Sequence, residues 1–181
     1  MGHARQIQTP ATPSASALFP QPGHNHDACM SATLTHAKSA FEARGLKWTQ
    51  LRETVLTEIA SSHHAVGAYD IIANLAKRDV RLAPISVYRT IEILMTAGIV
   101  HRLESRNAYF VCRTPHASAC ENIVFACLEC GTVAESAAPA TFASLDTLAG
   151  RLGFAVSARL AEVTGRCAHC AKAQSPKAGQ P

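Results

Sequence analysis

The chain has 181 residues, a formal net charge of +4 and 17% charged side chains, which indicates a globular protein of one ordinary domain or two small ones. Hydrophobic residues make up 48% of it, yet no apolar run approaches the length of a membrane span. The N-terminal residues lack the charged region and apolar core of a secretory signal, so we expect a cytoplasmic protein with reduced cysteines. The positive charge permits a polyanionic partner without requiring one.

The two ends of the chain have compositions that cannot bury a core. Residues 1–31 combine several prolines with Ala, Ser, Thr and Gln, which predicts a disordered tail. His24 and His26, with Asp27 and Cys29 nearby, could bind a metal loosely there, but ordering a flexible segment costs entropy, and a solvated tail is preferred. Residues 171–181 are predicted to form a second disordered tail.

Apolar residues repeat at helical spacing in four successive segments of the N-terminal half. The first segment covers residues 33–44, and the second follows Thr49, which is a good N-cap residue. The third and fourth segments are AYDIIANLAKRD and VYRTIEILMTAG, and the fourth begins near Pro84 and ends at Gly98. The pattern therefore predicts four short amphipathic helices.

Two β-rich runs follow these helices directly, in the stretch IVHRLESRNAYFVC. The turn-forming residues Ser105, Arg106 and Asn107 separate the two runs, which predicts a β-hairpin. Helices followed by a hairpin are typical of a winged helix, in which the last two helices form a helix-turn-helix and the hairpin is the wing. We therefore predict a winged-helix DNA-binding domain over residues 32–106.

In such a domain the first turn of the fourth helix faces the base edges of double-stranded DNA. The Arg89 guanidinium could bind a guanine through two hydrogen bonds, and Tyr88 could contact a thymine methyl group or a phosphate. The predicted DNA contacts come from the second, third and fourth helices: Arg52, Tyr69, Ser86, Tyr88 and Arg89. The alternative for each of them is an ordinary surface residue.

The remaining segments alternate between strands and one helix. NIVFACLEC and TVAES are predicted strands, SLDTLAGRLGF is a short helix ending near Gly153, and AVSARLAEVTGRC is a long strand. This pattern predicts a small α/β domain over residues 107–170. The whole chain is therefore expected to be of the α+β class.

Two CxxC pairs, Cys127 with Cys130 and Cys167 with Cys170, lie in turns beside predicted strands. Together they can supply the four tetrahedral sulfur ligands of a structural zinc. A thioredoxin-like redox motif would require one pair near a βαβ pattern, and two disulfides would require an oxidising compartment. The spacing therefore favours a structural four-cysteine zinc site.

Further candidate ligands straddle the junction between the two predicted domains. They lie in the two hairpin strands and around the first CxxC: His101, Cys112, His116, Cys120 and Glu135. Folding could bring four of them around one cation, and a mixed set of nitrogen, sulfur and oxygen donors suits zinc. Each residue also has an ordinary alternative, since cysteines are often buried as small hydrophobic residues and glutamates are usually solvated.

The segments AYDII, SVYRTIEIL, GIVHRLESRNAYFVC, FACLECGTVAE and CAHC resemble the Fur family of metal-dependent repressors, and most of all its zinc-uptake regulator branch. The similarity covers about residues 33–170. The iron and peroxide branches carry a histidine-rich run before the first CxxC, where this chain has ACENIVFAC. This difference argues against iron or peroxide sensing.

The resemblance implies that the four CxxC cysteines hold a structural zinc, and that His101, Cys112 and Glu135 are three ligands of a regulatory zinc. In the family the fourth regulatory ligand is usually a histidine seven residues before the first CxxC, where this chain has Cys120. His116 lies nearby, but we prefer Cys120 because a thiolate suits zinc. The resemblance further implies two zinc ions per monomer and a homodimer that binds pseudo-palindromic operators and represses zinc-uptake genes.

Two other functions are compatible with these residues: a Fur-family regulator of another metal, and a zinc or redox module that does not bind DNA. An enzyme is not expected, because the sequence lacks a Ser/His/Asp order, a phosphate-binding loop and an HExxH motif. Neither a membrane nor a small organic substrate is expected as a partner.

Overall fold

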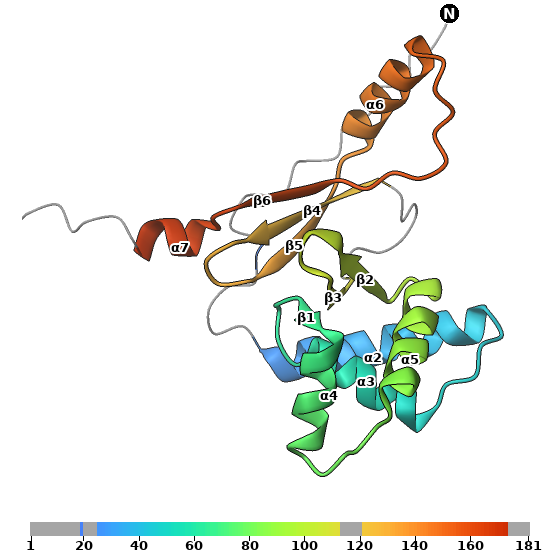
Figure 1. Ribbon diagram of the computed structural model, residues 1–181, viewed down its shortest axis with the longest axis vertical. Coiled ribbons are helices and arrows are strands. Elements are labelled where there is room, and N and C mark those ends of the chain that lie inside the picture. The colour runs from blue at the N-terminus through green and yellow to red at the C-terminus, as the bar shows by residue number, and fades with distance from the viewer. Residues whose placement is uncertain (1–18, 20–24, 113–120, 174–181) are drawn as a thin grey trace, which may run out of the picture.

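The computed structural model describes residue 19, residues 25–112 and residues 121–173. Figure 1 shows a group of helices at one end of the molecule, a β-hairpin beside it, and a second sheet with a helix projecting from its far end. The N-terminal helices are α2 (His26–Ala43), α3 (Gln50–Ala60), α4 (Ala68–Ala76) and α5 (Pro84–Thr96). No helix in these described ranges is both long and apolar enough to span a membrane.

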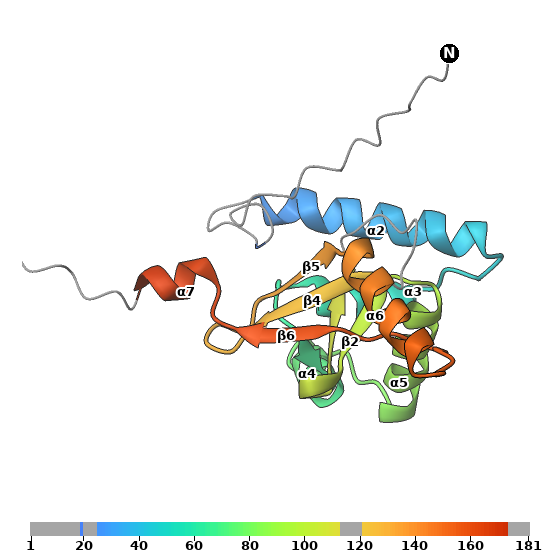
Figure 2. The same ribbon diagram turned by 90° about the horizontal axis from the view of Figure 1, so that it is seen from above.

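The helices form because their apolar faces close around one core. Phe41 of α2, Leu56 of α3, Ile71 of α4 and Ile91 of α5 are among the residues buried in it. Figure 2 shows α2 lying along one side of the molecule, across the other helices. The predicted N-cap of α3 is confirmed, since Thr49 Oγ1 accepts a hydrogen bond from the backbone N–H of Arg52 at 3.4 Å.

The predicted hairpin is confirmed as β2 (Val100–Leu103) and β3 (Ala108–Val111), connected by the short 3-10 turn η1 (Glu104–Arg106). Asn107 closes the turn in the left-handed region, with φ 48°, a conformation that asparagine tolerates better than most residues. The short strand β1 (Val66–Gly67) pairs with β3, which gives an antiparallel sheet of order β1-β3-β2. This sheet is called the wing below.

The second sheet has the order β5-β4-β6, with β4 (Asn122–Cys127), β5 (Val133–Ala137) and β6 (Glu162–Gly165). Strand β5 runs antiparallel to β4, and β6 runs parallel to it. Helix α6 (Pro139–Arg151) connects β5 to β6, and α7 (Ala168–Ala173) follows β6. The predicted α+β class is therefore confirmed.

The wing is buried on both faces. Val100 and Tyr109 belong to the core of the N-terminal helices. Leu103 and Phe110 instead belong to a smaller apolar cluster with residues of the second sheet, including Val124. We call this smaller group, which consists of Leu103, Phe110, Val124, Ala126 and Val133, the interface cluster. Because a strand places alternate side chains on opposite faces, the wing connects the helices to the second sheet.

Two segments predicted to be tails are partly helical. Helix α2 begins at His26, inside the predicted tail over residues 1–31, because Asn25 caps it by accepting a hydrogen bond from the N–H of Ala28 at 3.0 Å. The His26 ring also packs edge to face on His63, with 5.3 Å between the ring centres. Helix α7 similarly extends to Ala173, past the predicted boundary. Composition alone missed these local contacts.

The prediction of a long strand over AVSARLAEVTGRC is wrong, because only Glu162–Gly165 forms a strand, β6. Pairing with β4 begins where Glu162 lies beside Val124. Residues 154–160 before it are exposed. Their apolar alternation is that of a strand, but within the described residues β4 provides backbone partners only from Ala161 onward.

Candidate metal centres and nucleic-acid interface

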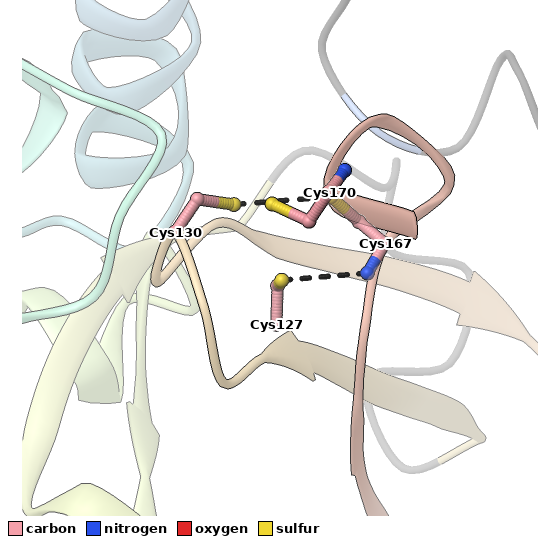
Figure 3. A group of neighbouring side chains, drawn as sticks. All are labelled: Cys127, Cys130, Cys167 and Cys170. Carbon is pink, nitrogen blue, oxygen red and sulfur yellow. Dashed lines mark hydrogen bonds between the residues drawn. The ribbon is translucent and has the colours of Figure 1, made fainter. Parts of the chain in front are cut away.

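The four CxxC cysteines come together where β4 ends and α7 begins (Figure 3). Cys127 ends β4, and the turn to Cys130 is closed by Gly131 at φ 75°, where a side chain would be strained. Cys167 and Cys170 return to this turn from the end of β6. The four sulfur atoms all lie within 4.8 Å of one another, so the cluster fits a structural zinc site.

Backbone hydrogen bonds to sulfur hold the cysteines of this cluster close together. The N–H of Cys167 donates to Cys127 Sγ at 3.3 Å, and the N–H of Cys170 donates to Cys167 Sγ at 3.5 Å. Cys130 Sγ lies 3.8 Å from Cys167 Sγ, and all four residues are free cysteines. Backbone N–H groups directed at sulfur favour thiolates, the form that binds zinc.

The pKa values of the cluster show why a cation suits it. Burial alone would raise the pKa of Cys127, but hydrogen bonds from the backbone at Cys130, Cys167 and Glu129 outweigh it and lower the pKa to about 6. Desolvation, followed by the three neighbouring thiols, raises the pKa of Cys170 to about 12. One sulfur therefore ionises readily while another resists ionisation. A metal cation would supply the positive charge that lets all of them ionise together.

The second group of ligands joins the wing to the second sheet. His101 lies on β2, Cys112 directly follows β3, and Glu135 lies on β5. One donor atom from each lies within 4.8 Å of the others. His101 Nδ1 is 2.8 Å from Glu135 Oε1, and the Glu135 side chain is only 4% exposed. A carboxylate this buried requires a cation or a strong hydrogen bond, so the site suits a metal ion.

Three of the five predicted regulatory candidates therefore meet. Cys112 is held in place by its own backbone, whose N–H donates to the carbonyl of Ile99 at 2.9 Å. Cys120 and His116 lie outside the described residues. The choice between them as a fourth ligand stays a prediction.

Two of the predicted DNA-contact residues, Tyr69 of α4 and Tyr88 of α5, contact each other. The Arg89 side chain is exposed, and Tyr69 is 73% exposed. The ring of Tyr88 packs edge to face against Tyr69, with 6.4 Å between the ring centres. Ser86 is partly buried in the first turn of α5. Val87, Ile91 and Leu94 of α5 are buried in the core.

Arg52 has local partners instead. Its guanidinium donates to the carbonyl oxygen of Lys47 and lies 5.5 Å from the centre of the Phe41 ring. These contacts account for the residue as part of the packing between α2 and α3. Whether Arg52 also contacts DNA stays a prediction.

Sequence reasoning missed two residues that link the wing to the second sheet. Arg106 Nη2 donates to the backbone carbonyl of Cys127 at 3.3 Å, so the wing turn contacts the cysteine cluster. Glu162 of β6 accepts hydrogen bonds from the wing backbone. Arg106 lies in a turn and Glu162 in a mostly exposed strand, and the spacing of apolar residues in the sequence gives no indication of either contact.

Comparison with known proteins gives consistent matches. A model of the ferric uptake regulator family matches residues 43–162. The zinc uptake regulation protein of Escherichia coli (strain K12) is 30% identical over 142 residues, which are 78% of this chain and 83% of that protein. A structure of a zinc uptake regulator complexed with zinc and DNA has a TM-score of 0.71 at 30% identity, covering 80% of this chain and 97% of that one. The crystal structure of holo XcZur has a TM-score of 0.70 at 33% identity, covering 79% of this chain and 99% of that one.

Proposed function

Because this chain belongs to the ferric uptake regulator family, we propose that it is a zinc-responsive transcriptional repressor that controls zinc-uptake genes. Relatives described as zinc uptake regulators, one of them solved with zinc and DNA, support this function. The observation that carries the proposal is the convergence of His101, Cys112 and Glu135 between the wing and the second sheet. A metal site at that place can control where the DNA-binding unit lies.

Each proposed monomer holds two zinc ions in different roles. Cys127, Cys130, Cys167 and Cys170 would hold the structural ion, because a closed set of four sulfur ligands leaves no position open for chemistry. His101, Cys112 and Glu135 would hold the regulatory ion, with Cys120 as the fourth ligand and His116 as the alternative. The role is regulatory rather than catalytic, and we place the protein in the cytoplasm.

The regulatory residues act by fixing the angle between the wing and the second sheet. His101 lies in the wing and Cys112 directly follows its last residue, whereas Glu135 lies on β5. Bound zinc would supply a cross-link between these two units. A state that binds both zinc and operator DNA better requires that each ligand raises the affinity for the other by the same factor, typically about 5- to 150-fold.

The α5 surface is the proposed reader of DNA. Its exposed Arg89 can bind a guanine edge in the major groove, while Tyr69, Ser86 and Tyr88 beside it contact bases or phosphates. Arg52 is a proposed phosphate contact at the start of α3. A net charge of +4 favours the approach to DNA without giving it sequence specificity.

A homodimer is the proposed assembly, because a two-fold symmetric protein presents two α5 helices to a pseudo-palindromic operator. The segment from α6 to β6 carries a run of exposed apolar side chains that a second copy would cover. They lie on α6, on β6 and between them: Leu145, Leu148, Leu152, Phe154, Val156, Leu160 and Val163.

A zinc titration of operator binding tests the proposal, with manganese and iron as comparison metals. The promoter fragment of a zinc-uptake gene should be bound in the presence of zinc and released when zinc is removed. Stronger activation by iron or manganese would assign the protein to another branch of the family. Failure to bind any promoter fragment with zinc present would instead favour a zinc module without a DNA-binding role.

A further inference from the structure

Glu162 of β6 reaches from the second sheet to the backbone of the wing. Its Oε1 accepts a hydrogen bond from the N–H of Glu104 at 2.5 Å, and its Oε2 accepts one from the N–H of Ser105 at 3.1 Å. These two donors are successive backbone groups in η1, at the tip of the wing. A carboxylate that accepts two neighbouring N–H groups holds them in one orientation, because both of its oxygens are used.

The register of the second sheet puts Glu162 in line with the regulatory site. Val124 of β4 lies beside Glu135 of β5 on one side and beside Glu162 of β6 on the other. These three side chains form one row across the sheet, and residues in such a row point to the same face. Each of them meets the wing, where Glu135 contacts His101, Val124 joins the interface cluster, and Glu162 binds the turn.

Within this row the wing is attached at two polar points on either side of an apolar contact. Outside the row, Arg106 of the wing turn binds the carbonyl of Cys127, and the N–H of Val133 on β5 binds the carbonyl of His63 in the loop before β1. The apolar contact is non-directional and tolerates rotation of one unit against the other. Without Glu162, the backbone of the wing tip would lose both of its carboxylate acceptors, and only the Arg106 side chain would still bind the second sheet from the wing turn. Two attachments in one row define an angle, which is the quantity that DNA binding by a dimer depends on.

The wing and the second sheet are not packed together over their whole boundary. An open pocket of about 240 Å³ lies between them, lined by residues that include His101, Glu104 and Glu135. The Glu104 side chain pairs with Arg102, with 3.3 Å between Oε2 and Nε. This ion pair offsets the repulsion between the carboxylates of Glu104 and Glu162. The carboxylate of Glu162 is then the acceptor for the N–H groups of the wing tip.

We propose that Glu162 is a positioning residue that holds the wing at the angle required for operator binding, and so lowers the zinc concentration at which the protein binds DNA. The inference rests on the proposed function, but the contact itself is independent of it. Glu162 is not a metal ligand here. It acts by favouring the same closed arrangement that the regulatory ligands favour from the other end of the row.

Amide hydrogen exchange in the full-length, zinc-loaded protein tests the contact directly. The amides of Glu104 and Ser105 should exchange about tenfold faster or more in Glu162→Ala than in the parent, because their acceptor is removed. Glu162→Gln keeps one carbonyl acceptor and should give an intermediate rate. Glu42→Gln is the matched control, since it removes an equal charge from an exposed position on α2. Unchanged exchange at these two amides in Glu162→Ala would overturn the proposal.

Zinc-dependent operator binding tests the consequence. The zinc concentration for half-maximal binding should rise about tenfold in Glu162→Ala, as expected when charge-assisted hydrogen bonds that favour the closed state are lost. Affinity at saturating zinc should recover to within a few-fold of the parent, and the zinc content and dimer should be unchanged. Glu42→Gln should keep the parental midpoint.

The outcomes separate this inference from the proposed function. Faster exchange with an unchanged zinc midpoint would show that the contact does not bias the closed state, and would overturn the proposal. Loss of zinc or of folding in both Glu162→Ala and Glu162→Gln would make Glu162 a structural residue and overturn it as well. A parent that binds no operator would refute the proposed function, while the exchange rates would still decide whether Glu162 holds the wing.

Discussion

At the scale of single residues, the regulatory site depends on polar side chains that come from the wing and from the second sheet. Glu135 is almost fully buried, and its carboxylate faces His101 across the boundary between the second sheet and the wing. Such a pair is stable with a shared cation or proton and unfavourable without one. Arg89 is the opposite case, because its side chain is exposed on α5, where a partner could reach it.

Replacing Arg89 with alanine should weaken operator binding by about 1–3 kcal/mol and relax base preference, if the guanidinium binds a guanine through two hydrogen bonds. Zinc content should not change. Arg44→Ala is a matched control, because it removes the same charge from an exposed residue at the end of α2. If both variants bind operator and scrambled DNA alike, Arg89 contributes only charge.

The identity of the fourth regulatory ligand can be read from cobalt spectra. With Cys112 and Cys120 both bound, cobalt in the regulatory site should show a sulfur-to-metal charge-transfer band whose intensity fits two thiolates. Cys120→Ala should reduce it to the intensity of one thiolate and abolish the zinc response of operator binding, whereas His116→Ala should leave both unchanged. The reverse pattern would make His116 the ligand.

At the scale of secondary-structure elements, the cysteine cluster holds the end of β4 to the end of β6. The carbonyl of Gly165 accepts a hydrogen bond from the N–H of Leu128 at 2.8 Å, and the two CxxC turns meet beyond it. Because the second sheet is small, we expect metal binding to supply much of its folding free energy. The hydrogen bond from Arg106 to the Cys127 carbonyl connects the wing turn to this cluster.

Cys127→Ser should therefore release zinc and unfold the second sheet, lowering the thermal stability of the whole protein. Metal analysis and a thermal unfolding curve measure the two effects. Cys29→Ser, which changes a cysteine of α2 outside the cluster, should preserve both values. Parental zinc content and stability in Cys127→Ser would contradict the structural role of the cluster.

The elements that the sequence predicted well are those whose signals are local. Thr49 and Pro84 marked the starts of α3 and α5, and the apolar spacing gave their buried faces. Strand β1 was missed because two residues, Val66 and Gly67, carry no periodicity. The length of β6 was overestimated because strand pairing depends on a partner, and the alternation of residues in one segment does not specify where that partner ends.

At the scale of the whole molecule, the wing is the layer that the N-terminal helices and the second sheet share. It packs on the N-terminal helices through one face and on the second sheet through the other. The candidate metal residues could be predicted because ligand types and CxxC spacing are visible in the sequence. The role of Glu162 could not, because it depends on the register between β4 and β6, which are separated by α6.

The central claim is that a metal bound at the wing controls DNA binding, and His101→Ala tests it most directly. Operator affinity should be measured against zinc concentration for the parent, for His101→Ala and for His36→Ala, which changes an exposed histidine of α2. We predict that His101→Ala keeps the structural zinc and the dimer but loses the increase in operator affinity with zinc, while His36→Ala behaves as the parent. An undiminished zinc response in His101→Ala would contradict the account.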